Sequence, residues 1–314
     1  MESAPQAFLG GKFLPLAEAK VGVMTHALHY GTAIFEGIRG NWNEEAESLY
    51  IFRVAEHYRR FLQGCHVMKM KLPYSVDDLV QLTIELVQRN GYRQDVYIRP
   101  LAFKSAQRVA VLKLQDLDDD VTIFAMPFGS YLDAETAARC CTSSWRRMED
   151  TMIPPRVKIA GLYVNSVLAK TEATESGFDE AIMLTQDGHV SEGTGENIFL
   201  VINGALVTPA LSDNILPGIT RDTVIHLAQN ELGMKTQERS VDRSELYLAD
   251  EVFLTGTAAH LTPVGEIDHR RVGGGQMGPA TRELQRLYFS VIRGRSPQYL
   301  HWCTAVPVKK AVKA

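Results

Sequence analysis

The chain has 314 residues, of which 45% are hydrophobic and 22% charged, as in a folded globular protein large enough for two domains. Its formal net charge of −4 provides no basic surface for nucleic acid or anionic lipid. It contains no apolar run long enough to span a membrane. We therefore expect small-molecule substrates and other subunits as partners, with no nucleic acid and no membrane.

The cysteine and histidine patterns indicate no metal site. The four cysteines show no C-x-x-C spacing, and the nine histidines do not form an H-E-x-x-H or paired Cys/His pattern. The first residues lack the basic and apolar regions of a signal peptide. We expect reduced thiols in a cytoplasmic protein.

The first 40 residues contain one clear element and one ambiguous one. Residues 8–16 predict a hairpin that turns at Gly10 and Gly11. Residues 26–40 mix aromatic, small and charged residues without a helical or strand period, which favours a strand lining a pocket. A buried strand with glycine bulges is the alternative.

Two helices follow. The apolar positions of residues 56–70 have helical spacing, and Arg60 lies beside that stripe, where its guanidinium is either solvated or able to bind an anion. Ser75 and Asp78 form a capping-box signal for a second helix, which ends at Asn90 and Gly91.

The next strands carry a candidate carboxylate site. Residues 96–103 predict a strand in which Tyr97 and Arg99 share one side, so a phenol and a guanidinium would lie together. The alternative is a cross-strand ion pair at a sheet edge. Residues 121–126 predict the last strand of this half, and residues 128–133 a crossing between domains.

Lys158 is the strongest catalytic candidate. It lies between the Pro154–Pro155 pair and Gly161, on a stiffened, irregular segment that precedes a helix over residues 163–176. A lysine held in such a segment, with a lowered pKa, can form a Schiff base with a carbonyl. The alternative for any single lysine is a solvated surface charge.

Glu192 lies in a glycine-rich stretch between two predicted hairpins, over residues 181–190 and 197–208. The sequence predicts a loop over residues 191–196 that directs this carboxylate into a cleft. A fixed carboxylate can keep a pyridine nitrogen protonated, so Lys158 and Glu192 together suggest pyridoxal phosphate. A turn-capping glutamate is the alternative.

Two further segments could bind an anion, although each signal is weak alone. Gly218 precedes a helix that begins at Ile219 and Thr220, where helix N–H groups attract phosphate. A strand over residues 251–255 leads into a turn of small residues at 256–259, whose amides could act similarly. The tail from Arg295 is expected to be frayed or loosely docked.

Several separated motifs resemble the class IV, or fold type IV, aminotransferases, and within them the branched-chain amino acid aminotransferases. The resemblance runs from about Phe8 to Gly294, and its most specific segments are residues 29–39, 97–100, 191–197, 216–221 and 256–259. It implies an α+β enzyme with two domains, a small N-terminal α/β domain and a larger C-terminal pseudo-barrel domain like that of D-amino acid aminotransferase. We expect residues 1–127 and 137–300 to form them, with a linker at 128–136 and a tail at 301–314.

The resemblance also implies roles at the pyridoxal 5'-phosphate site. Lys158 would form the Schiff base and move the proton, Glu192 would pair with the pyridine nitrogen, and Tyr163 would bind the ring hydroxyl oxygen. The phosphate would be bound by four residues: Arg60, Ile219, Thr220 and Thr257.

The substrate site is implied in the same way. Tyr97 and the amides of Thr257 and Ala258 would receive the substrate carboxylate, and Arg99 the second carboxylate of glutamate. The side-chain pocket would be lined by Phe35, Phe128, Tyr131 and Tyr163, with Tyr30 contributed across the interface of a homodimer or higher homo-oligomer.

The implied reaction is ping-pong transamination of leucine, isoleucine or valine with 2-oxoglutarate. Phe128 stands where the family often has tryptophan, and His260 where glutamate is common. The alternatives within the family are D-amino acid aminotransferase, (R)-amine transaminase and aminodeoxychorismate lyase. Two alternatives lie outside the pyridoxal-phosphate enzymes. One is an enzyme that forms a Schiff base on Lys158 without a cofactor, and the other is a non-catalytic protein that keeps the same fold.

Overall fold

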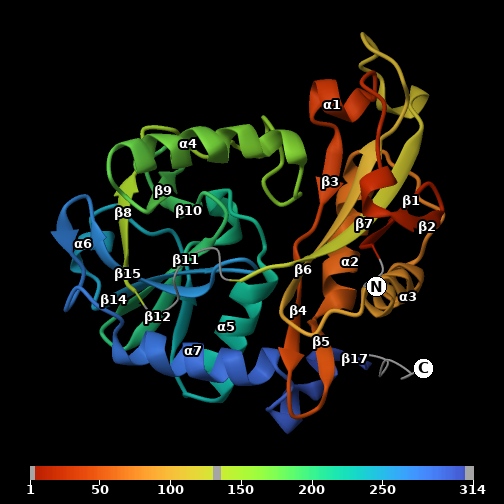
Figure 1. Ribbon diagram of the computed structural model, residues 1–314. Coiled ribbons are helices and arrows are strands. Elements are labelled where there is room, and N and C mark those ends of the chain that lie inside the picture. The colour runs from red at the N-terminus through yellow and green to blue at the C-terminus, as the bar shows by residue number, and fades with distance from the viewer. Residues whose placement is uncertain (1–3, 130–135, 308–314) are drawn as a thin grey trace. The chain divides into compact units, whose positions relative to one another are not determined.

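The computed structural model describes residues 4–129 and 136–307, which form two compact units, each built on its own β-sheet (Figure 1). Among the described residues, unit 1 comprises residues 4–129, 157–161 and 290–307. Unit 2 comprises residues 136–156 and 162–289. The segment that carries Lys158 thus belongs to unit 1, whereas the sequence predicted it in the C-terminal domain.

The sheet of unit 1 has eight strands, and every neighbouring pair is antiparallel. Its order is β17-β5-β4-β6-β7-β1-β2, with β3 also paired to β6. The strands are β1 (Gln6–Leu9), β2 (Lys12–Pro15), β3 (Ala33–Phe35), β4 (Ile38–Asn43), β5 (Ser48–Phe52), β6 (Val96–Lys104), β7 (Asp119–Pro127) and β17 (Cys303–Pro307). The predicted hairpin at Gly10 and Gly11 is confirmed as β1 and β2.

Helices α2 (Val54–Val67) and α3 (Val76–Asn90) pack against each other in unit 1, and α3 also contacts β1, β7 and β17. Both helices were predicted. Ser75 caps α3 through the expected capping box with Asp78, and the helix ends at Gly91 in the left-handed conformation, with a φ of 64°. Short 3-10 helices lie at Leu16–Glu18, Leu114–Asp116 and Pro297–Trp302.

Two predictions for unit 1 are wrong. Residues 26–40 are not one strand, because they begin with helix α1 (His26–Tyr30) and continue as β3 and β4. Gly31 ends α1 with a φ of 65°, and its N–H donates to the carbonyl of Ala27, so a single helical turn closes before the strand begins. The tail is not frayed over residues 295–307, since β17 pairs with β5 along the sheet edge.

The sheet of unit 2 has nine strands and is mixed. Its order is β10-β9-β8-β15-β14-β11-β12-β13, with β16 paired to β15. The strands are β8 (Ala138–Thr142), β9 (Glu180–Leu184), β10 (Val190–Gly193), β11 (Asn197–Ile202), β12 (Ala205–Thr208), β13 (Thr236–Glu238), β14 (Glu251–Gly256), β15 (His260–Ile267) and β16 (Arg270–Arg271). Glu192 lies within β10, so the predicted loop over residues 191–196 is shorter than expected.

Four α-helices accompany this sheet: α4 (Tyr163–Glu175), α5 (Ile219–Asn230), α6 (Glu245–Leu248) and α7 (Pro279–Ile292), whose last residues are grouped with unit 1. Short 3-10 helices lie at Ala160–Leu162, where unit 2 begins again, and at Leu211–Asp213. The core of unit 2 contains buried aliphatic side chains such as Ile198, Leu200 and Leu254. Among the described residues, no helix combines the length and hydrophobicity needed to cross a bilayer.

Candidate active site

Lys158 is fixed to strand β3 of unit 1 through its backbone. Its carbonyl accepts a hydrogen bond of 3.1 Å from the N–H of Phe35, and the next residue, Ile159, forms an isolated bridge with Ile34. The Nζ atom lies 5.1 Å from the centroid of the Phe35 ring, within the range of a cation–π contact. The expected irregular, anchored lysine is therefore present.

A close approach of two glycines fixes the other end of the lysine segment. Gly161 donates its N–H to the carbonyl of Gly31 over 3.1 Å. A Cβ atom on Gly31 would lie 2.6 Å from the Cα of Gly161, and the φ of Gly31 is 65°. Any larger side chain at Gly31 would push the lysine segment away from α1 and β3.

The guanidinium of Arg60 is held by a buried carboxylate. Glu36 accepts hydrogen bonds of 2.7 Å from both Nε and Nη2 of Arg60, and one of 2.8 Å from Nδ1 of His57. Burial by itself would raise the pKa of Glu36, but Arg60 and His57 lower it well below its ordinary value. Burial lowers the pKa of His57 and outweighs the effect of Glu36. The Glu36 carboxylate is therefore an anion that fixes the position of the Arg60 guanidinium.

Tyr97 and Arg99 lie together, as strand alternation predicted. Nη2 of Arg99 donates to the Tyr97 hydroxyl over 2.9 Å, and the guanidinium lies 4.4 Å from the centroid of the Phe35 ring. The Phe128 and Tyr97 rings are 5.4 Å apart. Within the described part of the chain, the buried Nε of Arg99 has no hydrogen-bond partner. The group is thus suited to a carboxylate beside aromatic walls.

The predicted pocket residue Tyr30 bonds to a residue outside this group. The Tyr30 hydroxyl accepts a hydrogen bond of 2.8 Å from the N–H of Ala110, and the side chain is 41% exposed. Tyr131 lies outside the described residues.

In unit 2, the Glu192 carboxylate is buried and receives donors from three separate segments. Nη2 of Arg147 lies 2.6 Å from Oε1. Nδ2 of Asn197 donates to Oε2 over 2.9 Å, and the backbone N–H of Leu216 donates to the same oxygen over 3.1 Å. These contacts prevent the carboxylate from turning, as a partner for a pyridine nitrogen requires.

The start of helix α5 lies next to Asn197. Gly218 is the N-cap and contributes no capping side chain to the first turn, which begins with Ile219 and Thr220. A Cβ atom on Gly218 would lie 2.0 Å from Oδ1 of Asn197, so a larger residue would displace the Asn197 side chain. Because Asn197 also donates to Glu192, the helix N-terminus and the carboxylate belong to one local cluster.

The turn that contains Thr257 and Ala258 joins β14 to β15, and both residues are half-buried. A Cβ on the preceding Gly256 would contact the carbonyl of Gly195 at 3.4 Å. The turn therefore lies beside the stretch that follows Glu192. Tyr163 is half-buried at the first position of α4.

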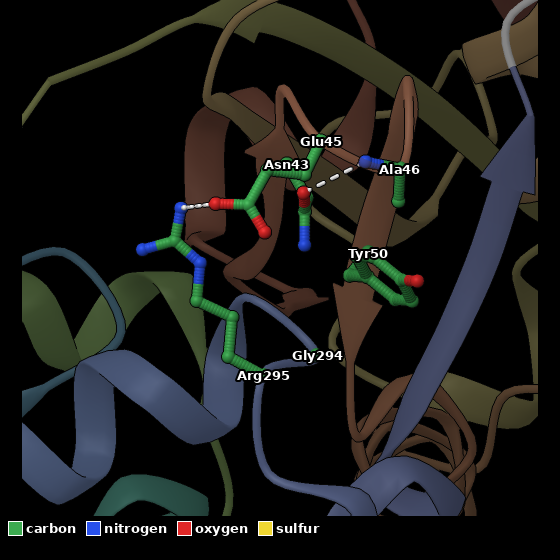
Figure 2. Close-up of a pocket in the computed structure, with 6 residues that line it drawn as sticks. All are labelled: Asn43, Glu45, Ala46, Tyr50, Gly294 and Arg295. Carbon is green, nitrogen blue, oxygen red and sulfur yellow. Dashed lines mark hydrogen bonds and ion pairs between the residues drawn. The ribbon is translucent and has the colours of Figure 1, made fainter.

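A surface pocket in unit 1 contains none of the predicted residues. Its volume is about 560 Å³, and it lies between the β4–β5 hairpin and the residues after α7 (Figure 2). Asn43 and Arg295 in its wall already bond to Ala46 and Glu45. Its lining residues are Asn43, Glu45, Ala46, Tyr50, Gly294 and Arg295. The chemistry of Lys158 is not located there.

Three residues whose side chains contact a candidate received no role from the sequence: Glu36, Arg147 and Asn197. His57, which bonds to Glu36, received none either. His57 and Arg60 are three positions apart and share a helix face, which was an available signal. Nothing in the sequence distinguishes the buried Arg147 from the exposed Arg146 beside it.

These groups fit pyridoxal phosphate chemically. Unit 1 contains the amine of Lys158 and the guanidinium of Arg60. Unit 2 contains the carboxylate of Glu192 and the start of helix α5, whose N-cap is Gly218. This cofactor requires an amine for its aldehyde and a carboxylate for its ring nitrogen. Its phosphate requires a cation and helix N–H groups.

Comparison with known proteins agrees with this chemistry. The profile of the family described as Amino-transferase class IV matches residues 33–267. A probable branched-chain-amino-acid aminotransferase of Aquifex aeolicus is 51% identical over 96% of both chains. The branched-chain amino acid aminotransferase of Thermobaculum terrenum in its PLP form is 42% identical, with a TM-score of 0.92 over 98% of this chain and 99% of that one.

A third relative is an archaeal protein of known structure. The branched-chain aminotransferase of the thermophilic archaeon Thermoproteus uzoniensis with norvaline is 43% identical, with a TM-score of 0.92 over 97% of this chain and 100% of that one. The two-domain α+β fold expected from the sequence is confirmed by these likenesses. The chain belongs to the class IV aminotransferases, among relatives that are branched-chain amino acid aminotransferases.

Proposed function

We propose that this protein is a pyridoxal-phosphate-dependent aminotransferase for leucine, isoleucine and valine. It gives the corresponding branched 2-oxo acids and uses 2-oxoglutarate as acceptor in a ping-pong reaction. The observation that carries the proposal is the anchored Lys158, whose backbone bonds to Phe35 and whose amine lies 5.1 Å from that ring. An amine in this setting is positioned to react with the cofactor aldehyde.

Each candidate residue has a distinct role in this proposal. Lys158 would hold the cofactor through its amine, and its Nζ atom would move the proton of the substrate α-carbon. Glu192 would hold the proton of the ring nitrogen, and Tyr163 would bond to the ring oxygen. The phosphate would be bound by Arg60, the amides of Ile219 and Thr220, and Thr257. The cofactor supplies an electron-withdrawing ring that accepts charge from the substrate.

The substrate pocket has to accept an aliphatic side chain in one half-reaction and a carboxylate in the other. Tyr97, with the amides of Thr257 and Ala258, binds the α-carboxylate. Phe35 and Phe128 provide apolar walls for leucine, isoleucine or valine, with Tyr163, Tyr131 and the partner's tyrosine at position 30. Arg99 contacts the Phe35 ring and the Tyr97 hydroxyl, so one guanidinium can receive the second carboxylate of glutamate beside an apolar wall.

We further propose a homodimer or higher homo-oligomer in the cytoplasm. In unit 1, Leu28 on α1 is 66% exposed, and in unit 2 Val164 and Val167 on α4 are 64% and 59% exposed. Such apolar side chains on helices support burial against a second copy. The four cysteines are free thiols, as in a reducing compartment.

The proposal is tested by the absorption spectrum of the purified holoprotein, recorded before and after addition of L-leucine, D-alanine or an (R)-amine without acceptor. We expect the band of the lysine-linked cofactor to convert to that of pyridoxamine phosphate with L-leucine. Conversion by D-alanine or the amine alone would assign the protein to another group of the family. A protein that binds no added cofactor would contradict the proposal.

A further inference from the structure

Three buried carboxyl groups lie in and beside strands β9–β11 of unit 2, with two cations to balance them. Glu180 accepts a hydrogen bond of 2.7 Å from Nζ of Lys170, and Glu192 lies 2.6 Å from Nη2 of Arg147. Within the described residues, no cation forms an ion pair with the third carboxyl, Glu196, although Lys170 acts on it at longer range. Burial raises its pKa to about 8, and the negative charges of Glu180 and Glu192 add to this effect. Each cation is therefore matched to one carboxylate, while Glu196 keeps its proton near neutral pH.

Arg147 is anchored by contacts with several elements. Its backbone N–H donates to the carbonyl of Leu184 in β9 over 2.8 Å. Its Nη1 donates to the Ser166 hydroxyl of α4 over 3.3 Å, and its Nη2 is directed at Glu192. Both side chains of the pair are less than a tenth exposed. The cation is built into unit 2 at a fixed distance from the Glu192 carboxylate.

A carboxyl group in this position would take up a proton if it stood alone. Burial penalises the charged form, and the nearby carboxyl group of Glu196 would add repulsion whenever it is ionised. A cation at 2.6 Å offsets both effects. Asn197 and the N–H of Leu216 also bond to Glu192, but these neutral donors carry no net charge.

We propose that Arg147 is a positioning residue that keeps Glu192 ionised and oriented, so that this carboxylate can hold a proton on the ring nitrogen of the cofactor. The inference rests on the proposed function, because it takes Glu192 as the partner of that nitrogen. Without the guanidinium, Glu192 takes up a proton and can no longer stabilise the charge of a pyridinium. The ring then withdraws electrons less strongly, and removal of the substrate α-proton slows.

The test uses R147Q, R147K and R146Q as holoproteins loaded with pyridoxal phosphate that is ¹⁵N-labelled at the ring nitrogen. The ¹⁵N chemical shift reports the ring proton directly. We expect R147Q to shift toward unprotonated pyridine and R147K to keep the wild-type shift. Each unit by which the pKa of the nitrogen falls reduces its protonated fraction about tenfold at pH values above that pKa. R146Q changes the exposed neighbouring arginine and should match the wild type.

The outcomes separate the Arg147 role from the function itself. A folded R147Q that retains the wild-type ¹⁵N shift, while E192Q loses it, would overturn the role of Arg147 only. A wild-type ring nitrogen without a proton, or an E192Q protein with an unchanged shift, would overturn the Glu192 role and this inference together. If R147Q does not fold, the ¹⁵N shift of R147K tests the proposal instead. This variant keeps the positive charge, so loss of its ring proton would contradict the proposal. A purely structural role would lower the Tm and leave the shift unchanged.

Discussion

The carboxylate of Glu36 holds the guanidinium of Arg60 through two hydrogen bonds of 2.7 Å, one to each carboxylate oxygen. Glu36 is completely buried and follows directly on β3, the strand that anchors Lys158. The orientation of Arg60 on α2 therefore depends on a residue 24 positions earlier in the chain. This pairing allows the contribution of Glu36 to cofactor binding to be tested separately.

Replacing Glu36 by glutamine should weaken pyridoxal phosphate binding. The amide keeps the side-chain shape but loses the charge and one of the two acceptor atoms, so Arg60 is no longer held at both contacts. A charge-assisted hydrogen bond is worth about 1.5–3 kcal/mol, so we expect the Kd to rise about 10- to 100-fold. Equilibrium dialysis of the apoprotein measures this. E45Q, which changes a glutamate in an exposed ion pair, is the matched control, and an unchanged Kd in E36Q would refute the positioning role.

Lowering the pH should show how much the Glu36–Arg60 pair contributes to the free energy of unfolding. The folded-state pKa of Glu36 is lowered from an ordinary value of 4.5, so its stabilisation is present above that pH and is lost as the pH falls below it. Between about pH 5 and pH 3, the wild type should lose more free energy of unfolding than E36Q, whose residue cannot titrate. Urea unfolding at each pH gives the comparison, and parallel losses in the two proteins would disagree with it.

The contribution of Glu196 to the free energy of unfolding should have the opposite pH dependence. Burial raises its pKa from 4.5 to about 8, with a contribution from Glu180, so the folded state binds a proton that the unfolded chain releases. Its stabilisation is fully present below pH 4.5 and is lost as the pH rises through about 8. E196Q should therefore lose less free energy of unfolding than the wild type between about pH 5 and pH 8. Identical slopes in urea unfolding experiments would show that Glu196 titrates normally.

Replacing Lys158 by alanine should abolish transamination and leave the fold intact. The side chain makes its ring contact with Phe35, whereas the segment is held by backbone bonds that alanine retains. We expect turnover to fall by several orders of magnitude, because both the covalent link and the proton carrier are lost. Stopped-flow absorbance with L-leucine measures this, and K113A changes an exposed lysine as the control. Near-parental turnover in K158A would exclude the assigned role.

Local signals in the sequence determined much of the fold. The capping box of Ser75 and Asp78 and the glycine at 91 predicted α3 with both of its ends, because these contacts involve residues only a few positions apart. Strand alternation placed Tyr97 beside Arg99 for the same reason. The separated motifs indicated the family to which the chain belongs. The same motifs indicated the candidate residues.

Only the tertiary structure could show what holds those residues in place. Arg147 and Glu192 are 45 positions apart, and their pairing depends on β9, β10 and α4 packing together. The prediction for residues 26–40 failed for a similar reason, since the single turn of α1 ends at Gly31, where the backbone of Gly161 packs closely. Burial and charge balance arise between distant segments, so the sequence identified the reactive groups, whereas the packed fold decided which charges face one another.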